Sequence, residues 1–168
     1  MIITPKPPIF PPQELKLSSK DPWRLAFSKM LGLQDLQTFA DELKDQITQK
    51  SPFVLWLHGE MGSGKTTLTQ ALMHSLGVPA SLKVLSPTYT YMSEYKTLSG
   101  DWLAHLDFYR ADHPCHPEDL GLVDIRDYRG YIVEWPTQMI PDDPLKPSSI
   151  LCIGAVASER TYTLWIKD

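Results

Sequence analysis

The chain has 168 residues, of which 42% are hydrophobic and 21% are charged. This length fits one domain, and the composition is ordinary for a globular protein that buries its core without disulfides or metals. The net charge of −4 argues against a protein that grips nucleic acid alone, because phosphate contacts favour a basic surface. Two cysteines exclude a disulfide framework and suit a reducing compartment, so a cytoplasmic protein is expected. The longest clean apolar run, residues 53–57, is too short to cross a bilayer, and no apolar signal core opens the chain.

The first 22 residues contain six of the fifteen prolines. Proline fixes φ and removes a backbone donor, so this segment is expected to be an extended arm. The folded domain is expected over residues 23–168. The composition leaves two interpretations of the arm open: a tail that is either floppy or draped over the surface, or a short proline-rich docking segment.

Residues 23–49 are expected to be helical, with a break near Gly32. The apolar positions that share one helical face are Leu36, Phe39, Ala40, Leu43 and Ile47. Residues 53–57 have the pattern of a buried strand. A second amphipathic helix follows a glycine-rich turn and ends near Gly77.

The second half of the chain alternates between short apolar runs and turn residues. Expected strands are residues 83–85, a half-buried strand at 102–109 and a strand at 130–133, while a helix is expected at 117–129 and a loop at 141–147. Residues 149–156 and 161–167 are expected to pair as a hairpin. Strands and helices mix without a repeat, which indicates an α/β fold with an antiparallel edge.

The segment Gly59-Glu-Met-Gly-Ser-Gly-Lys-Thr66 matches the phosphate-loop pattern G-x-x-x-x-G-K-[ST], between an expected strand and an expected helix. Small residues let backbone N–H groups turn toward phosphate oxygens, and the helix N-terminus adds its dipole. The Lys65 ammonium suits the β- and γ-phosphates, and the Thr66 hydroxyl is placed for Mg²⁺. The residues expected to hold the nucleotide phosphates are Glu60, Met61, Gly62, Ser63, Gly64, Lys65, Thr66 and Thr67.

The motif predicts a single P-loop NTPase domain with a mostly parallel central sheet flanked by helices and an antiparallel C-terminal hairpin. The chain contains no asparagine, so the Asn-Lys-x-Asp segment that reads guanine cannot occur. ATP is therefore the expected nucleotide.

Phosphoryl chemistry also needs an acid near Mg²⁺ at the end of a neighbouring strand. Glu134 ends the apolar run 130–133 and fits this position better than Asp107, which could instead position water or metal. Either carboxylate could simply cap a turn. Because the chain has a phosphate loop, at least one of the two is expected to lie at the metal. Residues 86–90, Ser-Pro-Thr-Tyr-Thr, form either a plain turn or a switch in which Thr88 meets the γ-phosphate or Mg²⁺.

Together these motifs resemble the TsaE family, also called YjeE, from Thr38 to Arg160. Its members are small ATPases required to form threonylcarbamoyladenosine next to the anticodon of bacterial tRNAs. The matching segments, in order, are 59–67, 86–90 with Glu94-Tyr95, 105–110, 125–128 and 133–136. A phosphate loop alone is common, but this series in this order is specific.

The resemblance implies a role for individual residues of this sequence. Those it assigns to hydrolysis are Asp107, Lys65 and Thr88, those it assigns to Mg²⁺ are Thr66 and Glu134, and those it places beside the nucleotide are Thr38, Trp135 and Arg160.

The resemblance also implies partners. Family members do not make the modification themselves but associate with a TsaD–TsaB pair, in which TsaD transfers the threonylcarbamoyl group and ATP hydrolysis resets the complex. The chain would then be a weak ATPase alone and would meet tRNA only through the complex. One alternative is a P-loop small-molecule kinase, although no arginine-rich lid segment is visible. Another is a binding module that never hydrolyses its nucleotide.

Overall fold

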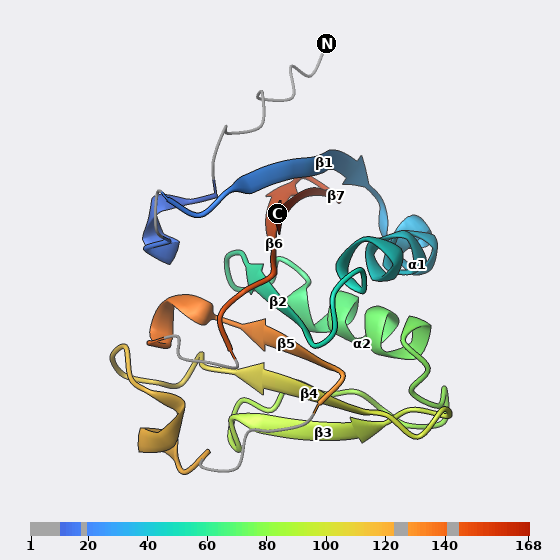
Figure 1. Cartoon of the computed structure of the whole chain (residues 1–168). Helices are drawn as coiled ribbons and strands as arrows, with labels where there is room; N and C mark the ends of the chain where they lie inside the picture. Colours follow the sequence, from blue (N-terminus) through green and yellow to red (C-terminus); the bar gives the residue numbers. More distant parts are fainter. Residues whose placement is uncertain (1–10, 18–19, 123–127, 141–144) are drawn as a thin grey trace.

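A computed structural model describes residues 11–17, 20–122, 128–140 and 145–168. Its α-helices are α1 (Leu36–Ile47) and α2 (Lys65–Ser75), and its 3-10 helices are η1 (Gln13–Leu15), η2 (Leu33–Asp35), η3 (Pro117–Leu120) and η4 (Pro136–Gln138). The strands are β1 (Trp23–Leu31), β2 (Phe53–His58), β3 (Met92–Lys96), β4 (Trp102–Asp107), β5 (Gly130–Glu134), β6 (Ser149–Val156) and β7 (Glu159–Lys167). Figure 1 shows these elements in chain order.

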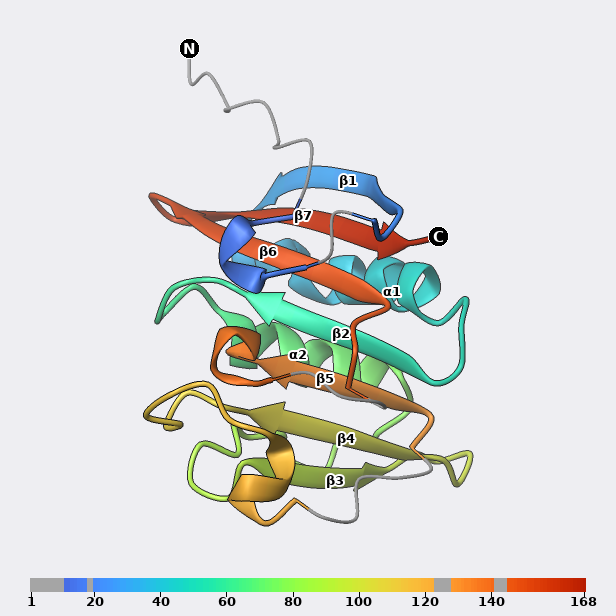
Figure 2. The ribbon, with the colours of Figure 1, turned by 60° about the vertical axis from the view of Figure 1, so that its left-hand side comes forward.

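The seven strands form one sheet in the order β1-β7-β6-β2-β5-β4-β3, which Figure 2 shows from top to bottom. The four inner neighbours β6, β2, β5 and β4 are parallel, whereas the β1–β7, β6–β7 and β3–β4 pairs are antiparallel. The fold is therefore α/β as predicted, but the sheet is mixed rather than mostly parallel. Short connections produce the antiparallel β3–β4 and β6–β7 pairs, whereas the antiparallel β1–β7 pair joins the two ends of the described domain.

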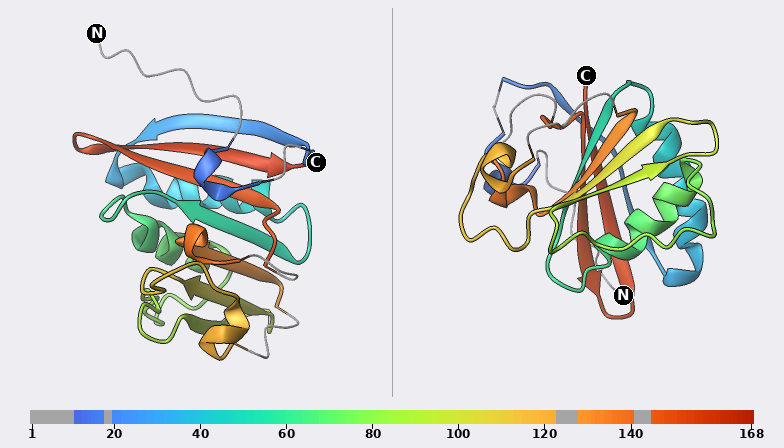
Figure 3. Two further views of the ribbon diagram at one scale, coloured as in Figure 1. Left: turned by 90° about the vertical axis from the view of Figure 1, so that its left-hand side faces the viewer. Right: turned by 90° about the horizontal axis from the view of Figure 1, so that it is seen from below.

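The two faces of the sheet are covered differently. Both α-helices lie on one face, as Figure 3 shows in the view from below, and their apolar sides pack on side chains such as Leu55, Ile132 and Leu151. Short 3-10 segments and loops cover the opposite face, where Trp56, Val133 and Trp165 are buried. The prediction of flanking helices is thus correct for one face only.

The expected helix over residues 23–49 is correct only in its second part. Helix α1 buries the predicted face, but residues 23–31 form strand β1, which pairs with β7 from Trp23↔Lys167 to Leu31↔Arg160. The pairing partner lies more than a hundred residues away, so local periodicity could not reveal it. Aromatic residues such as Trp23 and Phe27 suit a pleated surface as well as a helix.

Three other predictions need correction. Residues 83–85 form no strand: Val84 is buried, but Leu85 is exposed and the segment joins no ladder. The expected helix at 117–129 is only the 3-10 helix η3 over its first four residues, which Gly121 ends with a φ of +81°, and residues 123–127 lie outside the described part. The expected loop at 141–147 lies mostly outside it as well.

From Leu103 onward strand β4 is buried on both faces, not half-buried, because the helix-covered core lies on one face of the sheet and the loop-covered core on the other. Its alternation instead separates two environments. Ala104 and Leu106 belong to the core under the loops, whereas Leu103, His105 and Asp107 point toward the side of α2. Strand β3 was not predicted. The C-terminal hairpin β6–β7 is confirmed, with β1 rather than β7 at the edge of the sheet.

Part of the proline-rich segment packs on the domain. Leu15 in η1 is only 5% exposed and lies in the core on the loop-covered face, beside Trp56 and Met139. In the described part of the chain, no helix has the length and apolarity that a membrane span requires.

Replacing Leu15 with alanine should lower the free energy of unfolding by about 1–3 kcal/mol, since a buried leucine is lost from a segment that can also undock locally. Urea denaturation of Leu15→Ala measures this loss. Leu33→Ala is the matched control, because Leu33 is 74% exposed and its truncation should cost less than about 0.5 kcal/mol. Equal effects of the two substitutions would show that η1 is not packed in solution.

Candidate functional site

The carboxyl ends of three parallel strands meet at one edge of the sheet. Leu57 in β2 pairs with Glu134 in β5, and Glu134 pairs with Asp107 in β4. Parallel strands end on the same side, so this register sets both acids beside the loop that leaves β2. Crevices at this edge of an open α/β sheet are where such folds bind ligands.

The loop from β2 to α2 contains positions with positive φ, a backbone conformation that residues other than glycine rarely adopt. Gly62 and Gly64 have φ of +74° and +99°, and nothing lies within 4 Å of where a Cβ would be, so their backbone and not crowding requires glycine. Gly59 differs: a Cβ there would lie 2.7 Å from the Ile153 carbonyl oxygen. Helix α2 then begins at Lys65.

Lys65 is buried and held by the loop itself. Its Nζ donates to the carbonyl oxygens of Gly59, at 2.7 Å, and Glu60, at 2.8 Å, and lies 4.2 Å from the centre of the Trp135 ring. Burial lowers the pKa of Lys65 from its ordinary value, an effect that the nearby carboxylates of Glu134 and Asp107 oppose. The cation therefore stays close to the loop, where it can exchange carbonyl oxygens for an anionic ligand.

Glu134 is the centre of a buried hydrogen-bond network. Its Oε2 lies 3.3 Å from the Thr66 hydroxyl, and its Oε1 lies 3.3 Å from the Thr69 hydroxyl and 2.9 Å from His105 Nε2. The carboxylate is only 2% exposed. A buried carboxylate requires such partners, because desolvation without hydrogen bonds is costly. Its Oε2 faces the first turn of α2, beside the loop.

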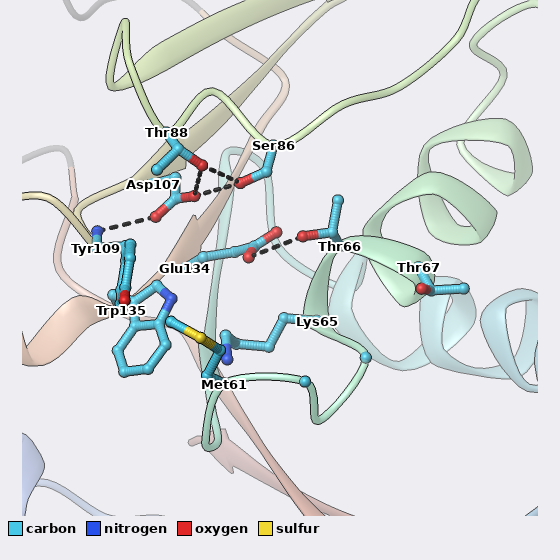
Figure 4. Close-up of a pocket in the computed structure, with 12 residues that line it drawn as sticks. Met61, Lys65, Thr66, Thr67, Ser86, Thr88, Asp107, Tyr109, Glu134 and Trp135 are labelled. Atoms are coloured by element: carbon cyan, nitrogen blue, oxygen red, sulfur yellow. Dashed lines mark hydrogen bonds between the residues drawn. The ribbon is translucent and has the colours of Figure 1, made fainter.

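Asp107 is held from two directions. The hydroxyls of Ser86 and Thr88 donate to its Oδ2, the latter at 3.0 Å, and the backbone N–H of Tyr109 donates to its Oδ1 at 2.9 Å. The segment that contains Ser86 and Thr88 is thereby attached to the end of β4 (Figure 4). The carboxylate and the two hydroxyls form one unit that faces the loop.

These groups surround a cavity of about 420 Å³. Figure 4 shows that the labelled residues come from the loop, from the start of α2, from the segment after α2 and from the ends of β4 and β5, and that the Thr67 side chain points away from the others. Its lining consists of Met61, Gly62, Gly64, Lys65, Thr66, Thr67, Ser86, Thr88, Asp107, Tyr109, Glu134 and Trp135.

Most of the residues predicted from the sequence line this cavity, and four do not. Glu60 and Ser63 contribute their backbone: the Glu60 carbonyl accepts from Lys65 and from the Ser63 N–H. Arg160 reaches the loop from β7, where its Nε donates to the Ser63 carbonyl at 3.0 Å. Thr38 is exposed on α1 and is not among the described residues that line the cavity.

Sequence reasoning did not select Ser86, Tyr109, Thr69 or His105 as site residues. Ser86 and Tyr109 lie within the segments 86–90 and 105–110, so their proximity in sequence to Thr88 and Asp107 was the available signal. His105 precedes Asp107 by two residues and therefore shares its face of the strand, a spacing that could have indicated it. Thr69 had no such signal.

The described architecture is thus an α/β sheet with a glycine-rich, lysine-containing loop and two acids at one edge. A family model described as "Threonylcarbamoyl adenosine biosynthesis protein TsaE" matches residues 32–161. The chain belongs to the TsaE family.

Curated relatives agree with this assignment. The tRNA threonylcarbamoyladenosine biosynthesis protein TsaE of Aquifex aeolicus is 34% identical over 119 residues, which cover 70% of this chain and 82% of that protein. The protein of the same name from Haemophilus influenzae is 37% identical over 101 residues, 58% of this chain and 60% of that protein. The chain thus spans about three fifths of the Haemophilus relative. The solved structure of Bacillus subtilis YdiB has a TM-score of 0.58 at 22% identity, with 90% of each chain covered, and supports the fold.

The contact between Lys65 and Trp135 leads to a spectroscopic prediction. A phosphate ligand would draw the Lys65 ammonium from the Gly59 and Glu60 carbonyls, so its position over the indole should change. Adding ATP with Mg²⁺ should therefore alter the intrinsic fluorescence, and Trp135→Phe should remove most of that change. Trp102→Phe is the control, because Trp102 lies at the opposite end of β4 and is 45% exposed. A full response in Trp135→Phe would contradict the prediction.

Proposed function

We propose that this protein binds and hydrolyses ATP with Mg²⁺ as an accessory protein of tRNA threonylcarbamoyladenosine biosynthesis, acting with TsaD and TsaB. The observation that carries the proposal is the shared position of Lys65, Thr66, Glu134 and Asp107 around one cavity at the carboxyl edge of the sheet. Family membership and the names of the relatives support the pathway.

The donor groups fit the proposed ligands. Backbone N–H groups of a glycine loop and a lysine ammonium suit phosphate oxygens, and the cavity has room for a phosphate chain. The Thr66 hydroxyl and the Glu134 carboxylate present oxygen atoms, the ligand type that Mg²⁺ prefers. When bound, Mg²⁺ would neutralise charge on the phosphate oxygens.

Different residues of the chain would have different roles in hydrolysis. Lys65 would exchange its bonds to the Gly59 and Glu60 carbonyls for bonds to phosphate oxygens, where its charge stabilises the transferring group. The hydroxyls of Ser86 and Thr88 occupy Asp107 Oδ2. Their release toward the γ-phosphate would free Asp107 to accept a hydrogen bond from the attacking water.

Low activity in isolation is part of the proposal. Efficient phosphate-loop hydrolases add an arginine that reaches the transition state. The Arg160 side chain donates to the loop backbone at Ser63. The Arg110 guanidinium lies over the Tyr89 ring, 4.7 Å from its centre. Neither of these two arginines lines the cavity among the described residues. A partner protein would therefore supply the group that stabilises the transition state, or would move a group of this chain into that position.

The decisive experiment is ATP hydrolysis by the purified protein, alone and with the matching TsaD–TsaB pair, in a tRNA modification assay. The pair should raise the rate, and the complete set should support repeated modification cycles. ATP binding that responds to neither the pair nor tRNA would contradict the proposed pathway role. A phosphorylated small-molecule product would instead establish a kinase.

Asp107→Asn should lower hydrolysis by roughly 100-fold, because it removes the carboxylate that orients water, while ATP affinity changes by only a few-fold. Single-turnover hydrolysis and equilibrium binding separate these effects. The matched control is Asp112→Asn, at an exposed position five residues further along, which should hydrolyse ATP like the unaltered protein. Unchanged hydrolysis in Asp107→Asn would remove Asp107 from the mechanism.

A further inference from the structure

His105 is a fully buried, polar side chain behind the cavity, and it does not line the cavity itself. It belongs to β4, on the face that is turned toward α2, and lies two residues before Asp107. Its Nε2 is 2.9 Å from Glu134 Oε1. A histidine is costlier to bury than an apolar residue, and the hydrogen bond to Glu134 offsets part of that cost.

The Thr69 hydroxyl is the competing donor to the same carboxylate oxygen. It lies 3.0 Å from the Lys65 carbonyl, one turn earlier in α2, and 3.3 Å from Glu134 Oε1. A hydroxyl can donate only one proton, and the Thr69 hydroxyl donates it to the nearer acceptor, the Lys65 carbonyl oxygen. His105 Nε2–H is then the donor that is committed to Glu134 Oε1.

The tautomer of His105 agrees with this assignment. Its Nδ1 has no hydrogen-bond partner within the described ranges of the chain. A proton on Nδ1 would leave a buried donor unpaired and would also put an unprotonated Nε2 against a carboxylate oxygen. A proton on Nε2 satisfies the contact and leaves only a neutral acceptor without a partner, which costs less.

Fixing one oxygen of a carboxylate fixes the other. The last torsion of a glutamate side chain is broad and allows the carboxylate to rotate unless hydrogen bonds hold it. With Oε1 bound by His105 on the inner side, Oε2 points to the Thr66 hydroxyl at the first turn of α2. This is the oxygen that would face a cation bound beside Thr66.

We propose that His105 is a positioning residue that orients the Glu134 carboxylate, so that Oε2 is presented to Mg²⁺ together with the Thr66 hydroxyl. The inference rests on the proposed nucleotide and Mg²⁺ site and adds a residue that acts on it from behind. Partners that orient a metal-binding carboxylate typically contribute 10- to 100-fold to metal affinity.

The test compares two amides that differ by one methylene. In His105→Gln the side-chain amide nitrogen can take the place of Nε2, whereas in His105→Asn the amide is too short to reach Glu134. A fluorescent ATP analogue reports nucleotide binding, first without Mg²⁺ and then across a Mg²⁺ titration. His105→Asn should raise the Mg²⁺ concentration for half-maximal response roughly 10-fold or more, with little change in binding without Mg²⁺. His105→Gln should restore most of the response.

A second arm asks whether His105 acts through Glu134. In a Glu134→Gln background, His105→Asn should cause no further loss, because the carboxylate that it positions is gone. Thermal unfolding of every variant checks folding, and His105→Leu replaces His105→Asn in the comparison where the asparagine variant does not fold.

The outcomes separate the inference from the proposed function. An unaltered protein whose nucleotide binding ignores Mg²⁺ would overturn the proposed Mg²⁺ site, and with it this inference. A folded His105→Asn protein with an unaltered Mg²⁺ response would overturn the inference alone. The inference alone would also be overturned if His105→Asn weakened nucleotide binding equally with and without Mg²⁺. In that case His105→Gln would not restore binding, and the loss would persist in the Glu134→Gln background.

Discussion

The parallel register of β2, β5 and β4 is the constraint on which the candidate site depends. It sets Leu57, Glu134 and Asp107 side by side at the carboxyl edge, although they come from three separate parts of the sequence. The loop that follows β2 must then pass beside both acids. A slip of one residue in β4 would turn Asp107 and His105 to the opposite face, since side chains alternate along a strand.

The charged groups at this edge are stabilised by polar side chains and by the backbone. Lys65 is bound by two loop carbonyls, Asp107 by two hydroxyls and a backbone N–H, and Glu134 by His105 and Thr66. Buried charges persist only with such partners, because removing a partner leaves the desolvation cost uncompensated. A ligand that binds Lys65 or the hydroxyls of Ser86 and Thr88 would therefore replace hydrogen bonds that these groups already make.

Two described elements that precede the family match, β1 and η1, extend the sheet and pack on its loop-covered face, respectively. The match begins at residue 32, after β1, which adds an antiparallel edge strand beside β7. The short helix η1 buries Leu15 against Trp56 in the middle of β2 and beside η4, the turn that follows Trp135. Helix η1 thus packs on the side of the sheet opposite the two α-helices and touches elements that lead to the site.

The sequence by itself determined the phosphate-loop motif, the apolar face of α1, the buried strand β2, the terminal hairpin and the identity of the two acids. Each of these is local: a spacing of glycine and lysine, a helical period, a short apolar run or a strand that ends in a carboxylate. Tertiary structure decided that residues 23–31 form a strand, because their partner is β7, and that residues 83–85 do not, because they join no backbone ladder with the strands of the described residues. It also decided that Ser86 binds Asp107 and that His105 binds Glu134. Such contacts depend on strand order and register, which long-range pairing sets and a local pattern cannot encode.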